Sequence, residues 1–200
     1  TAQASAKAAV TIFRESQRLV AMINTYLEVL RLDSGVRPLR VKETSVERMI
    51  DHVEQIIRPL AQSASVSIRT KLIAQDATID CDEALVSGVI LNLLSNAIKY
   101  SPQHSEVTLS VTPRERELEF SVRNSGPAIA AAELEHLFEK FYRSPQHSES
   151  ISGWGLGLTF VKRICEQHGG RVAVSSDSDS GTCFSFTLPL ASRAVAEALQ

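Results

Sequence analysis

The sequence predicts a mixed α/β domain preceded by one long helix. Residues 4–32 contain neither Gly nor Pro, and their apolar residues recur at heptad spacing, which is typical of a helix that packs against another helix. After Pro38, helical and strand periodicities alternate along the chain. Two hundred residues with 44% hydrophobic content can bury one core of about 100–150 residues plus an appendage. We therefore expect a helical segment over residues 1–35 and a folded domain over residues 36–200.

The opening helix carries an apolar stripe that it cannot bury alone. The stripe consists of Ile12, Leu19, Ile23, Tyr26 and Leu30. The helix starts without a convincing N-cap, so we expect its partner helix upstream in a longer protein or on another subunit. The turn residues Asp33-Ser34-Gly35 end it.

The domain begins with a helix, two strands and a second helix. Ser45 is a partial N-cap for an amphipathic helix over residues 46–61. Alternating apolar residues predict strands over residues 66–72 and 77–81. A second apolar helix then runs over residues 82–98.

The second half of the domain is rich in strands. Two alternating runs around a charged turn predict a hairpin over residues 107–122. A polar, Ser-rich stretch over residues 144–152 predicts a mobile loop. A helix over residues 158–168 and strands over residues 171–176 and 182–188 complete the domain.

Composition argues against several classes of function. The formal net charge of −2 provides no electrostatic footprint for nucleic acid or for an anionic membrane surface. No apolar run reaches the ~18 residues of a membrane span, so we expect no membrane contact by this part of the protein and a cytoplasmic location, even if a longer parent is membrane-anchored. Cys81, Cys165 and Cys183 lie within helix or strand patterns without paired spacing, which predicts reduced core residues.

Two asparagines mark the helix over residues 82–98. Asn92 and Asn96 are four residues apart and share one face, with Lys99 one turn further on. Amide oxygens there can hold a hard cation such as Mg²⁺, and the lysine can meet a phosphate. Taken alone, the pattern is equally compatible with two buried amides whose hydrogen bonds are satisfied.

Three further segments are informative only in combination with these asparagines. In residues 153–158 (GWGLGL), alternate glycines before a helix leave backbone amides at its positive end, where polyphosphate binds. Residues 124–127 (NSGP) follow a strand and are by themselves a turn. The aromatic residues of 137–143 (LFEKFYR) are by themselves core packing.

In their order along the chain, these segments resemble the five nucleotide-binding boxes of sensor histidine kinases. The matching segments are 92–101 (NLLSNAIKYS), 124–129 (NSGPAI), 137–143 (LFEKFYR), 153–158 (GWGLGL) and Gly181-Thr182. The opening helix, with its RLDSG ending, is similar to the second helix of that family's dimerisation and phosphotransfer hairpin. The resemblance covers essentially the whole chain. It implies a two-layer sandwich in which a mixed sheet of about five strands is covered by three helices and ATP lies beneath a flexible lid.

The resemblance also implies ligand contacts and partners. Asn96 is expected to ligate Mg²⁺, with Asn92 supporting the metal and the phosphates. The expected catalytic residues are Asn92, Lys99 and Arg143, and the expected ATP-binding residues are Asn92, Asn96, Lys99, Tyr100, Asn124, Gly126, Ile129, Arg143, Gly155, Leu156, Gly157, Leu158 and Thr182. The implied protein partners are a second copy of the chain, bound through the N-terminal helix, and the receiver domain of a response regulator.

Asn92 and the histidines bear on the class of reaction. ATPases of the gyrase, mismatch-repair and heat-shock chaperone kind resemble one another in having a glutamate four residues before the metal-binding asparagine, where a carboxylate can activate water. Asn92 occupies that position and is no general base, which favours phosphoryl transfer over hydrolysis. In the kinases an acidic residue follows the acceptor histidine, and none of the five histidines here has one. We therefore expect the acceptor on an upstream helix outside this sequence and no autophosphorylation of this chain.

Asn124 and Ala128 depart from the kinase pattern, which has aspartate and glycine at these positions. A neutral amide accepts a weaker hydrogen bond from adenine than a carboxylate does, by about 1 kcal/mol, so we expect weakened ATP binding. The amide can also donate to a guanine carbonyl, which leads to the hypothesis of relaxed base selectivity. The alternative to a kinase is a degenerate, non-catalytic nucleotide-binding or scaffold module that acts through the dimerisation helix.

Overall fold

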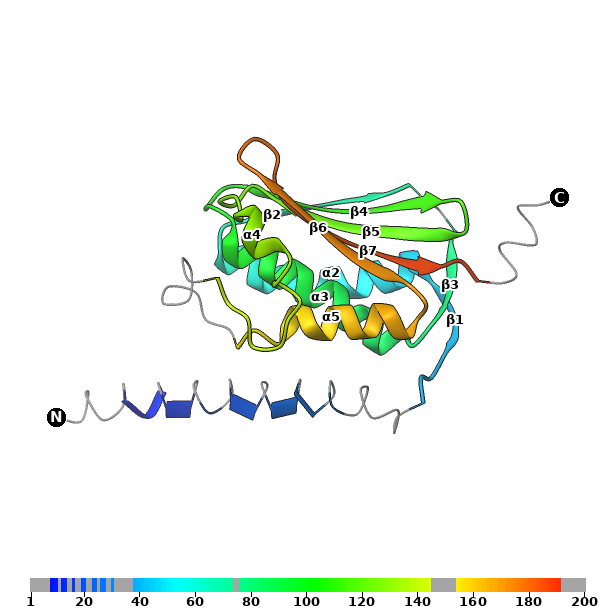
Figure 1. Cartoon of the computed structure of the whole chain (residues 1–200), viewed down its shortest axis with the longest axis horizontal. Helices are drawn as coiled ribbons and strands as arrows, with labels where there is room; N and C mark the ends of the chain where they lie inside the picture. The colour runs from blue at the N-terminus through cyan, green and yellow to red at the C-terminus, as the bar shows by residue number, and fades with distance from the viewer. Residues whose placement is uncertain are drawn as a thin grey trace.

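The computed structural model describes residues 38–73, 76–144 and 154–191, with residues 8–10, 12, 13, 16, 19, 20, 23, 24, 26, 27 and 30 of the opening helix. The domain has two layers (Figure 1), a five-stranded mixed sheet and a layer of helices that covers one of its faces. This arrangement confirms the architecture expected from the sequence.

The elements follow the predicted order, with additions. They are β1 (Lys42–Ser45), α2 (Val46–Ser63), β2 (Ser67–Leu72), β3 (Thr78–Cys81), α3 (Glu83–Tyr100), β4 (Glu106–Arg114), β5 (Glu117–Asn124), α4 (Ala131–Leu134), α5 (Gly157–Gln167), β6 (Arg171–Asp177) and β7 (Gly181–Pro189). The predicted turn at residues 33–35 and most of the predicted loop at residues 144–152 lie outside the described residues.

The main sheet has the strand order β2-β4-β5-β7-β6. Strands β2 and β4 are parallel, and the other neighbours are antiparallel. Strand β3 is not part of this sheet, because it pairs antiparallel with β1 in a separate two-stranded sheet. The sequence pattern does not predict β1, since Thr44 is its only buried residue and no apolar alternation marks it.

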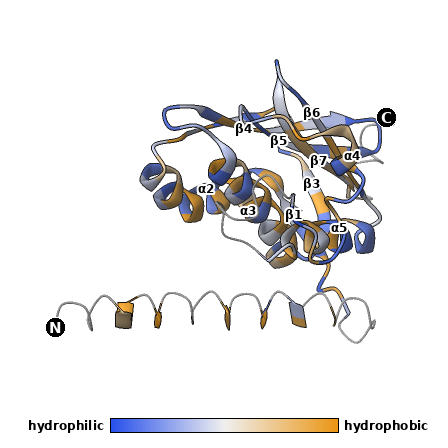
Figure 2. Cartoon of the chain, turned by 60° about the vertical axis from the view of Figure 1, so that its left-hand side comes forward, coloured by the Kyte–Doolittle hydropathy of each residue, from blue (hydrophilic) through white to orange (hydrophobic). Residues whose placement is uncertain are grey.

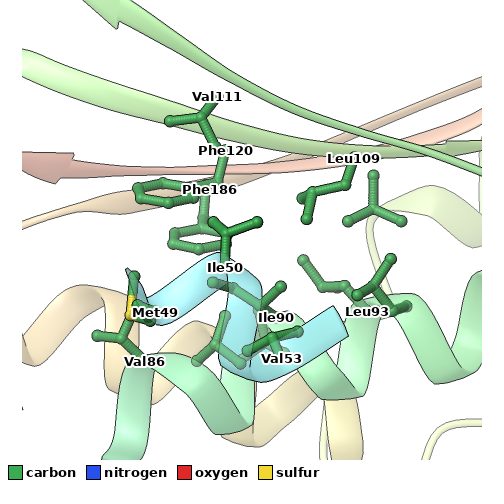
Figure 3. Packing of buried hydrophobic residues seen from close by; sticks show 14 of the residues in the cluster. Met49, Ile50, Val53, Val86, Ile90, Leu93, Leu109, Val111, Phe120 and Phe186 are labelled. Atoms are coloured by element: carbon green, nitrogen blue, oxygen red, sulfur yellow. The ribbon is translucent and has the colours of Figure 1, made fainter. Parts of the chain in front are cut away.

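Apolar side chains from both layers form one core. The rings of Phe120 on β5 and Phe186 on β7 stack with their centroids 4.7 Å apart. Met49 and Ile50 of α2 and Ile90 of α3 lie beneath the sheet in the same cluster (Figure 3). Each of these two helices begins with a side-chain N-cap. Ser45 Oγ accepts from the Arg48 N–H in α2, and Asp82 Oδ1 accepts from the Leu85 N–H in α3, both at 3.4 Å.

The cysteines follow the prediction with one difference. All three are free thiols, and Cys81 and Cys165 are buried. Burial raises the pKa of the Cys81 thiol to about 11 and that of the Cys165 thiol to about 12. Cys183 is only half-buried, because it points to the sheet face that the helices do not cover.

The described residues of the opening segment are helical and run along the side of the helix layer that faces away from the sheet (Figures 1 and 2). Most of the predicted apolar stripe is exposed, as expected for a helix that lacks its partner. The exposed members are Ile12, Leu19, Ile23 and Leu30. Tyr26 is half-buried, and its ring centroid lies 5.8 Å from that of Phe141 in the domain.

Candidate functional site

The helix-facing side of the sheet ends in a row of three polar side chains. Asn124 closes β5, Thr182 pairs with it on β7, and Ser176 pairs with Thr182 on β6. Asn124 and Thr182 are each 4% exposed. Ser176 Oγ lies 2.7 Å from Thr182 Oγ1 and accepts a hydrogen bond from the Ile129 backbone N–H at 2.9 Å. The structure therefore brings Asn124, Ile129 and Thr182 together, as the predicted site requires.

The amide of Asn124 contains a buried donor. Its Nδ2 makes no hydrogen bond to any residue that the structure describes. Leaving a buried donor unsatisfied costs about 1–3 kcal/mol, so a ligand that accepts a hydrogen bond here would be favoured. Gly126 packs closely beside it, because a Cβ at this position would lie 2.7 Å from Nδ2 and 2.4 Å from the carbonyl oxygen of Tyr100. Glycine thus lets the loop after β5 approach the end of α3.

The two asparagines of α3 interact with each other. Asn96 Nδ2 donates to Asn92 Oδ1 at 3.3 Å, which places both on one helix face as predicted. Because Asn96 donates through its nitrogen, its Oδ1 is the atom that remains for a cation. Among the described residues, no three His, Cys, Asp or Glu side chains gather into a metal cluster. Amide oxygens are hard ligands, so the pair fits Mg²⁺.

The second glycine segment packs against this asparagine pair. Gly157 begins α5, and a Cβ on it would lie 2.6 Å from Asn92 Nδ2 and 2.7 Å from Asn92 Oδ1. Gly155 has a φ of 67°, which favours glycine, and Leu156 is buried. The N-cap residue Leu156 makes no side-chain capping hydrogen bond, so among the described residues the backbone amides of the first turn of α5, which includes Leu158, are uncapped at the positive end of the helix. Gly153 lies outside the described residues.

Two cationic side chains lie near the C-terminal end of α3. Lys99 belongs to its last turn and is exposed. Burial raises the pKa of Tyr100 above its ordinary value, and the positive charge of Arg143, in the segment before the predicted lid, offsets part of this rise. Asn96, Lys99 and Tyr100 thus share the C-terminal part of α3, and Arg143 acts on Tyr100 through its charge.

The segments on either side of the predicted lid are joined at their base. The Phe141 N–H donates to the Gly155 carbonyl at 2.9 Å, and Thr159 Oγ1 donates to the Phe138 carbonyl at 3.2 Å. A Cβ on Gly155 would lie 2.5 Å from the Tyr142 carbonyl oxygen, which shows how closely these segments pack. The segments that contain Phe141 and Gly155 are thus in direct contact at the base of the predicted lid. Motif spacing alone does not predict this contact.

Ser176 is the residue of this site that the motifs did not identify. The alternation of residues 171–176 places it on the same strand face as Val172 and Val174, and this signal could have marked it as facing the helices.

In the part of the chain that the structure describes, each helix is too short or too polar to cross a bilayer.

Comparison with known proteins identifies the family and the fold of the chain. Residues 81–192 match the family model described as histidine kinase-, DNA gyrase B- and HSP90-like ATPase. The chain belongs to this family. Within it, the chain carries the catalytic, ATP-binding domain of a sensor histidine kinase. Sensor protein QseC of Salmonella typhi is 36% identical over 164 residues, which cover 82% of this chain and 35% of QseC. The chain thus spans about a third of the length of this relative.

Solved kinase structures share the fold. Full-length ShkA in complex with AMPPNP superposes with a TM-score of 0.80 at 28% identity, over 92% of this chain and 39% of ShkA. Histidine kinase ThkA in complex with the response regulator protein TrrA gives a TM-score of 0.71 over 88% of this chain and 49% of ThkA. At 21% identity, the ThkA similarity shows the fold alone.

Proposed function

We propose that this chain binds ATP with Mg²⁺ and that the whole protein transfers the γ-phosphoryl group to a histidine on an upstream helix. The observation that carries the proposal is the packing of Gly157 against the Asn92 amide, which joins the phosphate-binding glycines to the asparagine helix. The same helix meets the row of polar residues on the sheet, because Gly126 packs against the Tyr100 carbonyl. Helix α3 therefore connects a phosphate end and a base end of one site.

Each residue of the proposed site has a role that its position supports. Asn96 Oδ1 ligates the metal, and Asn92 holds the Asn96 amide through their 3.3 Å hydrogen bond. When bound, Mg²⁺ supplies charge neutralisation at the phosphates. Lys99, in the last turn of α3, and Arg143, whose charge acts on Tyr100, add positive charge for the phosphates. The remaining contacts are assigned to Tyr100, Asn124, Gly126, Ile129 and Thr182 around the base and to the backbone amides of Gly155, Leu156, Gly157 and Leu158 at the phosphates.

The chemistry of Asn92 supports transfer rather than hydrolysis. A general base must accept a proton from water, and an amide in this position cannot do so. In phosphoryl transfer the protein mainly positions the reactants and neutralises charge. Asn96, Lys99 and Arg143 provide groups for both tasks without a carboxylate.

The proposed partners follow from the opening helix and from the family. The exposed stripe of Ile12, Leu19, Ile23 and Leu30 supports a homodimer in which a second copy covers it. A response regulator receiver domain is the proposed acceptor of the phosphoryl group, and the ThkA complex with TrrA is an example in a protein of the same fold. We place the domain in the cytoplasm, because that compartment supplies ATP.

Nucleotide titration followed by a transfer assay tests this proposal. We expect Mg²⁺-dependent ATP binding that Asn96→Ala weakens about tenfold, since a contact to a charged group is lost. Gln55→Ala on the exposed face of α2 removes an amide remote from the site and should have no effect. Supplying the upstream hairpin with its histidine and γ-labelled ATP should yield phosphohistidine. A folded dimer that binds ATP without transferring phosphate would favour the non-catalytic module.

A further inference from the structure

Ser176 connects two residues of the proposed ATP site. It accepts a hydrogen bond from the Ile129 backbone N–H, in the loop after β5, and its hydroxyl contacts that of Thr182 on β7. The two distances, 2.9 and 2.7 Å, are those of well-formed hydrogen bonds. None of the nucleotide-binding segments recognised in the sequence includes Ser176.

The orientation of Thr182 depends on this contact. Rotation about χ1 would exchange the hydroxyl and the methyl group of the threonine, and the hydrogen bond to Ser176 selects one rotamer. Thr182 is 4% exposed, so bulk water cannot readily replace a lost partner. Removing the Ser176 hydroxyl would therefore leave the Thr182 hydroxyl free to turn away from its place beside Asn124.

The direction of the hydrogen bond between the Ser176 and Thr182 hydroxyls determines whether Thr182 can donate to a ligand or only accept from it. Each hydroxyl donates one hydrogen bond and accepts up to two. When Ser176 donates to Thr182, the Thr182 proton is left for a ligand, and when Thr182 donates to Ser176, Thr182 presents only lone pairs. The pair can thus act as donor or acceptor next to the buried Asn124 Nδ2. The edge of a purine base, with ring nitrogens and an exocyclic group, needs both kinds of contact.

We propose that Ser176 is a positioning residue for the nucleotide base. It orients the Thr182 hydroxyl beside Asn124 and holds the Ile129 loop against β6, so it acts on recognition of the base and leaves phosphate binding unchanged. This inference rests on the proposed ATP site. It adds to that site a residue on the edge strand β6, whose effect passes through Thr182 and Ile129.

Comparing two ligands on three variants of the full chain tests the inference. ATP carries the base, and ribose 5-triphosphate keeps the sugar and phosphates without it. Ser176→Ala should weaken ATP binding about tenfold and change ribose 5-triphosphate binding by less than about twofold, as expected for loss of one buried hydrogen bond near the base. Ser176→Thr keeps the hydroxyl and should restore ATP affinity. Ser175→Ala, on the opposite and exposed face of β6, is the matched control and should behave as wild type.

The outcomes separate this role from a structural one and from failure of the site itself. Equal weakening of both ligands by Ser176→Ala, or ATP affinity equal to wild type, would overturn the inference. Melting of each variant without nucleotide identifies unfolding, and a melting temperature lowered in Ser176→Thr as much as in Ser176→Ala, with no rescue of ATP affinity, would also overturn it. A wild-type chain that binds neither ligand would contradict the proposed ATP site as well.

Discussion

The base end and the phosphate end of the proposed site are built from different kinds of structure. At the base end, Asn124 and Thr182 sit on neighbouring strands, are each 4% exposed and are held in register by the sheet. At the phosphate end, the groups come from α3, from the start of α5 and from the segments beside the predicted lid, where Phe141 is 58% exposed and Trp154 is 49% exposed. Strand register fixes the positions of the base-end residues, whereas close packing at glycines fixes the positions of the phosphate-end groups.

This difference indicates where a substitution changes affinity and where it changes selectivity. A side chain on a paired strand has little freedom to move, so the amide chemistry of Asn124 determines what a ligand meets at this position. Gly157 contributes no side chain to the site. Because it lacks a Cβ, α5 can pack closely against Asn92 of α3. We therefore expect substitution of the glycine that packs between α5 and α3 to weaken nucleotide binding strongly, and strand substitutions to tune it.

Gly157→Ala should have the largest effect. The new Cβ would lie 2.6 Å from Asn92 Nδ2, which is closer than carbon and nitrogen can approach, so α5 or Asn92 must shift. A shift of α5 would separate the amides of the second glycine segment from Asn96, and a shift of the Asn92 side chain would break its hydrogen bond with Asn96. ATP affinity should therefore fall about 100-fold or more, the loss expected when two or more charge-assisted contacts fail together. Isothermal titration with ATP and Mg²⁺ measures the loss.

Gly88→Ala is the matched control for this substitution. Gly88 is also helical, but a Cβ on it would meet only the Phe160 ring at 3.5 Å, an ordinary contact. Alanine is preferred to glycine within a helix by about 0.5–1 kcal/mol, so this variant should melt slightly higher and bind ATP normally. Normal ATP binding by Gly157→Ala would show that the Asn92 contact does not hold the phosphate end together.

Asn124→Asp should have an intermediate effect of the opposite sign. A carboxylate accepts a stronger hydrogen bond from the adenine amino group, so ATP affinity should rise about fivefold, which corresponds to about 1 kcal/mol. Affinity for GTP should fall at the same time, because the carboxylate cannot donate to the guanine carbonyl. Titrations of both nucleotides give the ratio. If wild type already prefers ATP as strongly as Asn124→Asp does, the hypothesis of relaxed base selectivity is wrong.

Much of the fold could be predicted because periodicity reports burial directly. The helices α2, α3 and α5 each present an apolar face to one core, and their predicted ranges agree with the structure to within a few residues. Strand β1 could not be predicted, because its four residues bury one threonine and pair with β3 outside the main sheet. Pairing between distant short strands leaves little periodic signal.

The site was predictable in its local parts and not in its tertiary contacts. The spacing of Asn92 and Asn96 implied their shared face, and the 3.3 Å hydrogen bond between them agrees with it. The contact of Gly157 with Asn92 joins residues far apart in the sequence, and no spacing rule reports it. Ser176 was overlooked for the same reason, since its importance comes from Thr182 and Ile129 on other segments. The roles of the individual ligand-binding residues stay predictions.

The smallest effect on stability is expected for the His136–Glu139 pair, in the segment that leads to the predicted lid on the phosphate side of the site. His136 Nδ1 lies 2.8 Å from Glu139 Oε1, and this hydrogen bond raises the pKa of His136 above its ordinary value of 6.5. A pKa raised by folding means that the pair stabilises the segment fully below pH 6.5 and that this contribution is lost as the pH rises through the folded value. Both side chains are largely exposed, so the effect on stability is small. An NMR titration should show a lower His136 pKa in Glu139→Gln than in wild type. Glu135→Gln is the control, because Glu135 is the weakest contributor to the shift. An unchanged His136 pKa in Glu139→Gln would mean that the His136–Glu139 hydrogen bond does not form in solution.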